Sequence, residues 1–357
     1  MKKILIIPLL GIEYEGITSV IYNYINNMNK DGLIINFTTF DKTELKLMNI
    51  FNGIGEVYRI PERKKFVFSY IKALYMLLKN RYDVVHIHGN SGTMLIETIL
   101  AKMSGVKKII VHCHSTACNH PIINRILTPI MKCIATNFIA CSNASGKWLY
   151  KKNFIVLNNA IDLEKFQYNN LVRKKYRQEL GIKNEFVIGH VGTFNESKNH
   201  EFLIEVFKEI YKLDSKIKLL LIGGGPLFED IKNKIYEFNL KDSVIFLGCR
   251  DDVENLYQVM DCFVFPSKWE GLGVVLIEAQ ASVLPCFVST SVPKDAKVTD
   301  LIQYLSLKES SKVWAEKILD VHADFRAEKK DVVIEQITNS GYEIKNNACI
   351  LKEIYMR

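Results

Sequence analysis

Several motifs that define common classes of protein are missing from this sequence of 357 residues. None of its eight cysteines stands in a Cys-x-x-Cys pair, so neither a thioredoxin-like redox site nor a cysteine zinc site is indicated. There is no Asp-x-Asp pair to suggest a carboxylate loop for Mg²⁺. The Gly-rich turn at 223–225 lacks Gly-x-Gly-x-x-Gly, which argues against a dehydrogenase. We expect reduced thiols, a cytosolic location and no metal or other cofactor.

Long apolar runs are also missing, and none approaches the roughly 20 residues that span a bilayer. The opening MKKILIIPLL resembles a signal peptide only briefly, because Gly11 and Glu13 follow it without a cleavage-like site. We therefore interpret this segment as a first β-strand.

Basic charge is concentrated in the first half of the chain. Residues 1–165 contain 21 Lys and Arg against 11 Asp and Glu, whereas the whole chain carries +8. No nucleic-acid-binding motif or basic tail accompanies this charge, so nucleic acid is not expected as a partner. An anionic membrane surface and a diphosphate-linked acceptor fit it better. The segment 63–81 predicts a helix that covers a sheet, with a membrane-lying helix as the alternative.

The length favours two domains, and the alternation of apolar strands with helices favours α/β domains with parallel sheets. A continuous apolar run bounded by turn residues is typical of a strand buried on both faces. Buried strands of this kind are expected at 4–10, 83–88 and 108–114. Further strands are expected at 33–40, 55–60, 137–141, 154–157, 186–192 and 244–248.

The most informative stretch is FVFPSKWEGLGVVLIEAQASVLP at 263–285. Gly271 and Gly273, with Leu272 between them, leave the backbone uncrowded where a helix should begin. The N–H groups of Gly273, Val274 and Val275 can then face an anion such as a phosphate.

A carboxylate stands on each side of these amides. Glu270 precedes the first turn, and Glu278 lies roughly 7.5 Å beyond Gly273 along the helix axis. This order fits a nucleotide sugar laid along the helix, with sugar hydroxyls on Glu270, the diphosphate on the amides and the ribose on Glu278. The alternative is a surface turn with two solvated acids.

Three residues elsewhere are candidates for the same ligand. Lys198, in a loop after a strand, is placed to neutralise a diphosphate. Arg250 follows another strand and could contact the base, while the nearby Asp251 or Asp252 could begin a helix as its N-cap. Gly16 would let the first loop approach a bound ligand closely, although glycine is also usual in tight turns.

Two strands end in His-x-His. Alternation places His86 with His88, and His112 with His114, on single faces of their strands. Four histidines suggest zinc, but no acidic ligand stands at a typical spacing. Ligands of parallel sheets gather beyond the carboxyl ends of strands, so His88 and His114 are the better candidates for contacting a sugar or acceptor. A core histidine bonded to backbone is the alternative.

The two glutamates and the Gly-rich turn resemble the signature of the retaining glycosyltransferases of family 4, which are two-domain GT-B enzymes. The resemblance extends to VGTFNESKNHEFLIEVF (191–207), LLLIGGGPLFEDIKNKI (219–235) and the segment 244–267. The tail at 291–319 is similar to a branch that builds bacterial capsule and exopolysaccharide.

This resemblance implies two Rossmann-like doubly wound domains facing a central cleft. The N-terminal acceptor domain would cover 1–164 and the C-terminal donor domain 165–336, with a helix in 337–357 crossing back to the N-domain. It implies transfer of a hexose from a nucleotide diphosphate sugar, with UDP favoured by family frequency. Glu270 and His114 would be catalytic, and His88 would lie on the acceptor side.

The acceptor implied is a lipid-linked saccharide at the inner face of the cell membrane, and the enzyme would be peripheral there and independent of metal. The chain departs from the family at Thr193, where relatives usually carry an arginine that binds phosphate, and at Val283, where they carry glycine. Two alternatives remain: a GT-B epimerase acting on the nucleotide sugar, and a non-catalytic subunit of a polysaccharide synthase.

Overall fold

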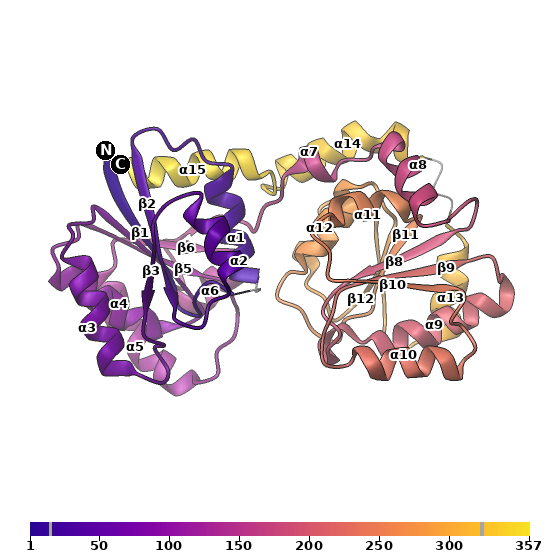
Figure 1. Cartoon of the computed structure of the whole chain (residues 1–357), viewed down its shortest axis with the longest axis horizontal. Coiled ribbons are helices and arrows are strands. Elements are labelled where there is room, and N and C mark those ends of the chain that lie inside the picture. Colours follow the sequence, from indigo (N-terminus) through magenta and orange to yellow (C-terminus); the bar gives the residue numbers. More distant parts are fainter. Residues whose placement is uncertain (14–15, 322–324) are drawn as a thin grey trace. The chain divides into compact units, whose positions relative to one another are not determined.

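The computed structural model describes residues 1–13, 16–321 and 325–357. The chain forms two compact units, the first made of residues 1–160 and 343–357 and the second of residues 161–342 (Figure 1). Both are α/β units with a parallel sheet, as the alternation of apolar strands and helices predicts.

The first unit is built on seven strands, in the order β3-β2-β1-β4-β5-β6-β7, and all neighbouring pairs are parallel. The order reverses beside β1, so β1 and β4 flank the point where ligands of doubly wound sheets bind. The strands are β1 (Lys2–Pro8), β2 (Leu33–Phe40), β3 (Val57–Ile60), β4 (Val84–Gly89), β5 (Lys108–Cys113), β6 (Asn137–Ala140) and β7 (Ile155–Val156).

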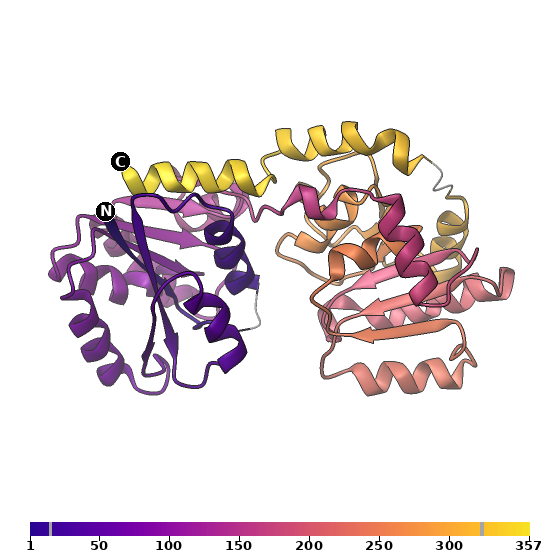
Figure 2. The ribbon, with the colours of Figure 1, turned by 45° about the horizontal axis from the view of Figure 1, so that its top comes forward.

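Helices cover both faces of this sheet (Figures 1 and 2). Contacts join α3 (Val67–Leu78) to α4 (Leu95–Met103) and α4 to α5 (Pro121–Ile134) on one face, while α1 (Gly16–Asn26) packs against α15 (Ile344–Met356) on the other. The remaining helices are α2 (Leu45–Asn52) and α6 (Asn143–Leu149), with a short turn η1 (Gly92–Met94) before α4.

Helix α3 covers the sheet with one face, as the sequence predicts. Tyr70, Leu74, Leu77 and Leu78 are buried, whereas Val67 is 41% exposed. The helix begins only at Val67, because the preceding residues form a turn, so its first residue has no preceding turn to hold it against the sheet.

The second unit has six parallel strands, in the order β10-β9-β8-β11-β12-β13. They are β8 (Val187–Val191), β9 (Lys218–Ile222), β10 (Val244–Gly248), β11 (Cys262–Phe265), β12 (Cys286–Ser289) and β13 (Ile302–Leu305). Its helices are α7 (Leu163–Phe166), α8 (Asn170–Glu179), α9 (His200–Leu213), α10 (Phe228–Glu237), α11 (Val253–Val259), α12 (Val274–Ala281), α13 (Ser311–Leu319) and α14 (Arg326–Asn339), with short turns η2 (Glu196–Lys198) and η3 (Lys294–Ala296).

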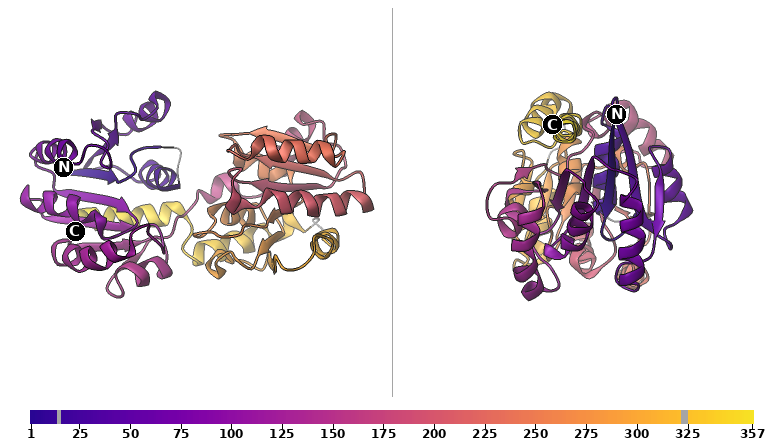
Figure 3. Two further views of the ribbon diagram at one scale, coloured as in Figure 1. Left: turned by 90° about the horizontal axis from the view of Figure 1, so that it is seen from below. Right: turned by 90° about the vertical axis from the view of Figure 1, so that its left-hand side faces the viewer.

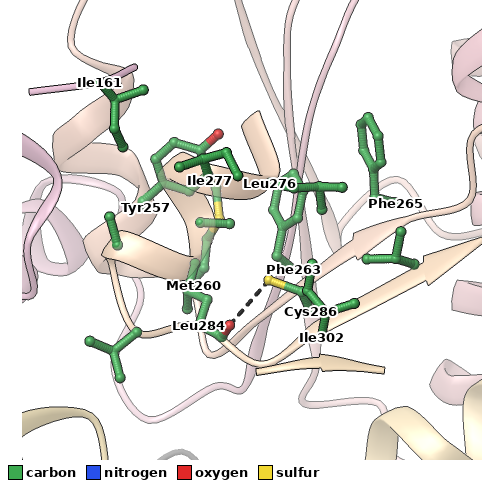
Figure 4. Packing of buried hydrophobic residues seen from close by; sticks show 14 of the residues in the cluster. Ile161, Tyr257, Met260, Phe263, Phe265, Leu276, Ile277, Leu284, Cys286 and Ile302 are labelled. Atoms are coloured by element: carbon green, nitrogen blue, oxygen red, sulfur yellow. Dashed lines mark hydrogen bonds between the residues drawn. The ribbon is translucent and has the colours of Figure 1, made fainter. Parts of the chain in front are cut away.

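In this unit, α9, α10 and α13 pack together, and α12 packs with α11 and α14 (Figure 3). Figure 4 shows the core beneath α12, where Leu276 and Ile277 lie among Tyr257, Phe263 and Phe265. Because these side chains are fully buried, the start of α12 is held rigidly against the sheet.

The C-terminal segment is divided between the two units. Residues 337–339 end α14 and, with 340–342, belong to the second unit, while α15 belongs to the first. The side chain of Glu343 accepts a hydrogen bond from the Asn346 N–H and so caps the start of α15. Among the described residues, every helix is too short or too polar to cross a membrane.

Candidate functional site

The turn at the start of α12 requires glycine at one position. Gly273 has φ +77°, and a Cβ there would lie 3.3 Å from the Phe265 ring. Gly271 faces open space, so its lack of a side chain is not forced by contacts. Gly273 occupies the N-cap position and has no side chain to bond the first amides. The N–H groups of the first turn therefore remain available to an anion, and the helix dipole favours one there.

Lys198 and Glu270 come together beside this turn. The Lys198 Nζ lies 2.5 Å from Glu270 Oε1, and the two side chains are 17% and 11% exposed. The same ammonium lies 4.9 Å from the centroid of the Phe265 ring. Burial on this scale strengthens the attraction between the charges relative to a surface pair.

Two loops are bonded to each other to hold this pair. Asn195 Oδ1 accepts the Lys198 N–H at 3.2 Å, which orders η2. The Lys268 N–H donates to Ser197 O at 2.7 Å, and Asn199, in the left-handed conformation, donates from Nδ2 to Pro266 O at 3.1 Å. The loop after β8 and the loop after β11 therefore form one hydrogen-bonded platform.

Glycines let a third loop join the platform. A Cβ on Gly223 would lie 2.1 Å from Gly192 O, and one on Gly225 would lie 2.6 Å from Phe194 O. Both glycines have positive φ. The Gly-rich turn after β9 thus serves close packing of backbone against backbone.

Glu278 lies in the second turn of α12 and has a partner that the sequence did not indicate. The Tyr257 hydroxyl is 2.9 Å from Glu278 Oε2 and 3.2 Å from Val275 O. Burial raises the pKa of Glu278 to about 7, against the hydrogen bond from Tyr257, which lowers it. A carboxylate that titrates near neutrality can accept ribose hydroxyls in its ionised form.

Arg250 and Asp252 are bonded to each other. Arg250 donates from Nε and Nη2 to the two oxygens of Asp252, at 2.8 and 2.7 Å, and Tyr176 also donates to that carboxylate. Asp252 stands at the N-cap position of α11, as predicted, but its side chain makes no capping hydrogen bond. The stronger charge-assisted pair with Arg250 takes its oxygens instead.

The four histidines of the two His-x-His pairs form a stack at the carboxyl ends of β4 and β5. His88 Nδ1 lies 2.9 Å from His114 Nε2, and His86 Nδ1 lies 2.7 Å from the Tyr355 hydroxyl. Burial lowers the pKa of His86 and of His114 to about 3, so both rings are neutral at neutral pH. His88 is only 3% exposed. We therefore expect His88 to orient His114 rather than to contact an acceptor itself.

A pocket of about 600 Å³ lies beside this stack, at the carboxyl ends of β1, β4 and β5. Its polar lining includes Arg63, Lys64, Asn90 and Ser115. Arg63 is anchored by an ion pair of 2.9 Å with Glu97, whose side chain is fully buried. This ion pair was not predicted from the sequence. The one feature that could have indicated it is the single acid, Glu97, inside an otherwise apolar helical run.

A larger hollow of about 780 Å³ lies near the amino ends of β8 and β11 and contains Arg173 and Arg177. Both arginines bond to Asp261 and to the Val259 carbonyl, so their charge is already satisfied. It stands at the opposite end of the sheet from the platform, and we assign it a structural role.

Two further candidates occupy exposed positions. Gly16 is the first residue of α1 rather than part of the preceding loop, and nothing lies within 4 Å of where its Cβ would be. Thr193 is exposed, and its carbonyl accepts the Asn195 N–H. Because a threonine side chain is neutral, it contributes no positive charge to the platform. Lys198 is the cation that the structure places beside Glu270.

Known proteins match the chain over almost all of it. The sequence model of glycosyltransferase family 4 matches residues 14–165, and that of glycosyl transferases group 1 matches residues 172–338. The chain is 28% identical to "Putative glycosyltransferase EpsF" of Bacillus subtilis, over 97% of this chain and 94% of that protein.

A second relative is the UDP-Gal:alpha-D-GlcNAc-diphosphoundecaprenol alpha-1,3-galactosyltransferase of Escherichia coli. It is 32% identical over 61% of this chain and 60% of its own length. Among solved structures, HepE of Anabaena in complex with UDP has the same fold, with a TM-score of 0.77, 16% identity and 99% coverage of both chains.

Proposed function

Because the chain belongs to the GT-B glycosyltransferases of family 4, we propose that it transfers a hexose, with retention, from a UDP-sugar to a lipid-linked saccharide during polysaccharide synthesis. The observation that carries this proposal is the buried Lys198–Glu270 pair beside the uncapped start of α12. It brings together the cation, the amides and the carboxylate that such a donor needs.

In this proposal, the donor diphosphate binds the first-turn amides of α12 and Lys198. The negative charge that grows on the leaving diphosphate is stabilised by groups already in place, so the transfer itself needs no metal. Glu270, released from Lys198, orients the sugar and faces the oxocarbenium-like centre. Glu278, held by Tyr257, binds the ribose hydroxyls.

Two relatives support the proposal of UDP as the nucleotide. HepE has been solved with UDP and with UDP-glucose, and the E. coli relative is named for a UDP-sugar donor. Arg250, already oriented by Asp252, is the group that we assign to the base side of the nucleotide.

The acceptor is assigned to the first unit. Its pocket offers Arg63 and Lys64 to a diphosphate-linked saccharide, and His114 lies at the same edge of the sheet. The E. coli relative and a Campylobacter jejuni relative are both named for diphosphoundecaprenol-linked substrates.

A peripheral position on an anionic membrane is part of the proposal. The first unit exposes Ile122, Ile123, Ile126 and Ile130 along α5, at 45% to 76%. Arg125 is exposed on the same helix. An apolar helix face with basic neighbours on a positively charged unit is typical of binding to the interface of anionic lipids.

The donor assignment is tested by thermal shift of the purified protein with UDP-, GDP- and ADP-sugars. A ligand that binds only the folded state raises the melting temperature by mass action. We expect stabilisation by UDP-sugars that is lost in Glu278→Ala. Stabilisation by another nucleotide class, or by none, would contradict the assignment. In a separate incubation without acceptor, release of a new nucleotide sugar would indicate an epimerase.

A further inference from the structure

The histidine stack of the first unit contains buried ring nitrogens that have no partner among the described residues. These are His86 Nε2, His88 Nε2, both nitrogens of His112, and His114 Nδ1. An unsatisfied buried polar atom is costly, and a native structure normally pairs it. Here the unpaired atoms occur together, which indicates that they share a ligand.

Three of the rings lie close enough together to share one metal ion. One nitrogen from each of His86, His88 and His112 lies within 4.8 Å of the other two. The ring centroids are 4.0 Å apart for His86 and His88, 5.4 Å for His86 and His112, and 5.0 Å for His88 and His112. Three imidazoles bound to one tetrahedral Zn²⁺ have ring centres roughly 5 Å apart.

The backbone already supports this arrangement. His88 on β4 stands directly opposite His112 on β5, and His86 is two residues earlier on the same face of β4. Nitrogens bound to one tetrahedral Zn²⁺ lie roughly 3.4 Å from each other. The His86 and His112 rings are parallel to within 2°, so at least one of these side chains must rotate to direct its nitrogen at the same ion.

The outer nitrogens of two rings are held as metal-bound histidines usually are. His86 Nδ1 bonds to the Tyr355 hydroxyl at 2.7 Å, and His88 Nδ1 bonds to His114 Nε2 at 2.9 Å. Such bonds fix the tautomer and leave Nε2 of each ring to the metal. Zinc was not favoured from the sequence because no acidic ligand stands at a typical spacing. A zinc site made of three imidazoles and one open position does not need an acidic ligand.

We propose that His86, His88 and His112 form a binding site for one Zn²⁺ ion. An all-imidazole set selects zinc and similar late first-row metals over Mg²⁺ and Ca²⁺, which prefer oxygen. The site belongs to the first unit and supplies nothing to the leaving diphosphate. Its ion would link the sheet to α15 through His86 and Tyr355.

Cobalt(II) is the probe, because its visible absorption distinguishes four-coordinate binding from weak octahedral surface binding. Tag-free protein, dialysed against a chelator, is titrated with Co²⁺ and then with competing Zn²⁺. We expect about one Co²⁺ per chain with the intense bands of a four-coordinate site, displaced by Zn²⁺. Zn²⁺ should also raise the melting temperature.

Three variants locate the site. His112→Phe should weaken binding at least about 100-fold, and Tyr355→Phe, which alters only the outer bond of His86, about 10- to 100-fold. His120→Ala, which removes an exposed histidine of the same unit, should bind as the wild type does. Circular dichroism checks that each variant is folded, and Tyr355→Phe decides the matter if His112→Phe does not fold. Absence of four-coordinate Co²⁺ in the wild type, or undiminished binding in folded His112→Phe or in Tyr355→Phe, would overturn the proposal.

Discussion

The Lys198 ammonium contacts the Glu270 carboxylate at 2.5 Å, although the two residues are 72 positions apart in the sequence. Each residue is predicted to bind a different part of the donor, and here each neutralises the other. A bound diphosphate would take the ammonium, and the transferred sugar would take the carboxylate. The pair therefore keeps both groups ordered before the donor arrives, and the donor must replace their contact.

Replacing Lys198 by Met should weaken binding of the UDP-sugar by about 10- to 100-fold, because a charge-assisted hydrogen bond contributes about 1.5–3 kcal/mol. Isothermal titration calorimetry measures this change. The matched control is Lys268→Met, which removes an exposed lysine of the adjacent loop that pairs with the exposed Glu196. Equal loss of affinity in both variants would show that Lys198 acts through general charge rather than through contact.

Glu278 should make stability depend on pH near neutrality. Its folded pKa of about 7 lies above its ordinary value of 4.5, so the folded state holds a proton that the unfolded state releases. The resulting stabilisation is full below about pH 4.5 and is lost as the pH rises through 7. The free energy of unfolding of Glu278→Gln should therefore exceed that of the wild type by a few kcal/mol, but only as the pH rises through this window. Urea unfolding at several pH values measures this difference. A constant difference from pH 4 to pH 8 would contradict this.

Tyr257→Phe removes the hydrogen bond that lowers the pKa of Glu278. The pKa should then move further upward, and so should the pH at which UDP-sugar affinity rises. The measurement is the donor Kd between pH 6 and pH 9 in the two proteins. Tyr176→Phe is the control, because Tyr176 bonds to Asp252 instead. If Tyr257→Phe lowers affinity equally at every pH, the tyrosine supports only packing.

Gly273→Ala should lower the free energy of unfolding by about 1–2 kcal/mol, because alanine resists positive φ, and the close Phe265 ring adds to this. It should also weaken donor binding, since the first-turn amides would shift. Gly271→Ala is the matched control: no atom lies within 4 Å of its Cβ position, so the change should be under about 0.5 kcal/mol. Thermal unfolding with and without UDP-sugar measures both effects, and equal behaviour of the two variants would contradict the assigned turn.

The double substitution Ile122→Asp and Ile126→Asp should reduce binding to mixed phosphatidylcholine and phosphatidylglycerol vesicles about tenfold or more. Both residues are exposed on α5, at 76% and 60%. Ile350→Asp, which alters an exposed residue of α15 on the other face of the sheet, should have little effect. Vesicle sedimentation provides the measurement. Unchanged sedimentation of the double variant would exclude α5 as the membrane surface.

Sequence patterns predicted the elements whose signal is local. Continuous apolar runs located β2 and β5, and the Gly-rich turn located the start of α12. The faces of the His-x-His pairs followed from alternation alone. What local patterns could not provide was contact between distant residues, such as Glu278 with Tyr257.

The expectations that differ from the structure also concern features that local patterns do not determine. Asp252 was expected to cap α11, but Arg250 binds both of its oxygens, and no local rule ranks these partners. The helix expected in 337–357 is α15, which starts only at Ile344, because residues 337–339 complete α14.

The central claim is tested most directly by measuring hexose transfer from UDP-sugar to a diphosphate-linked lipid saccharide, with wild type, Glu270→Ala and Glu278→Ala compared side by side. We predict a product whose anomeric configuration matches that of the donor. Glu270→Ala should mainly lower kcat and Glu278→Ala should mainly raise the donor KM, each by roughly 10- to 100-fold. Wild-type kinetics in both variants, or a product of inverted configuration, would contradict the account.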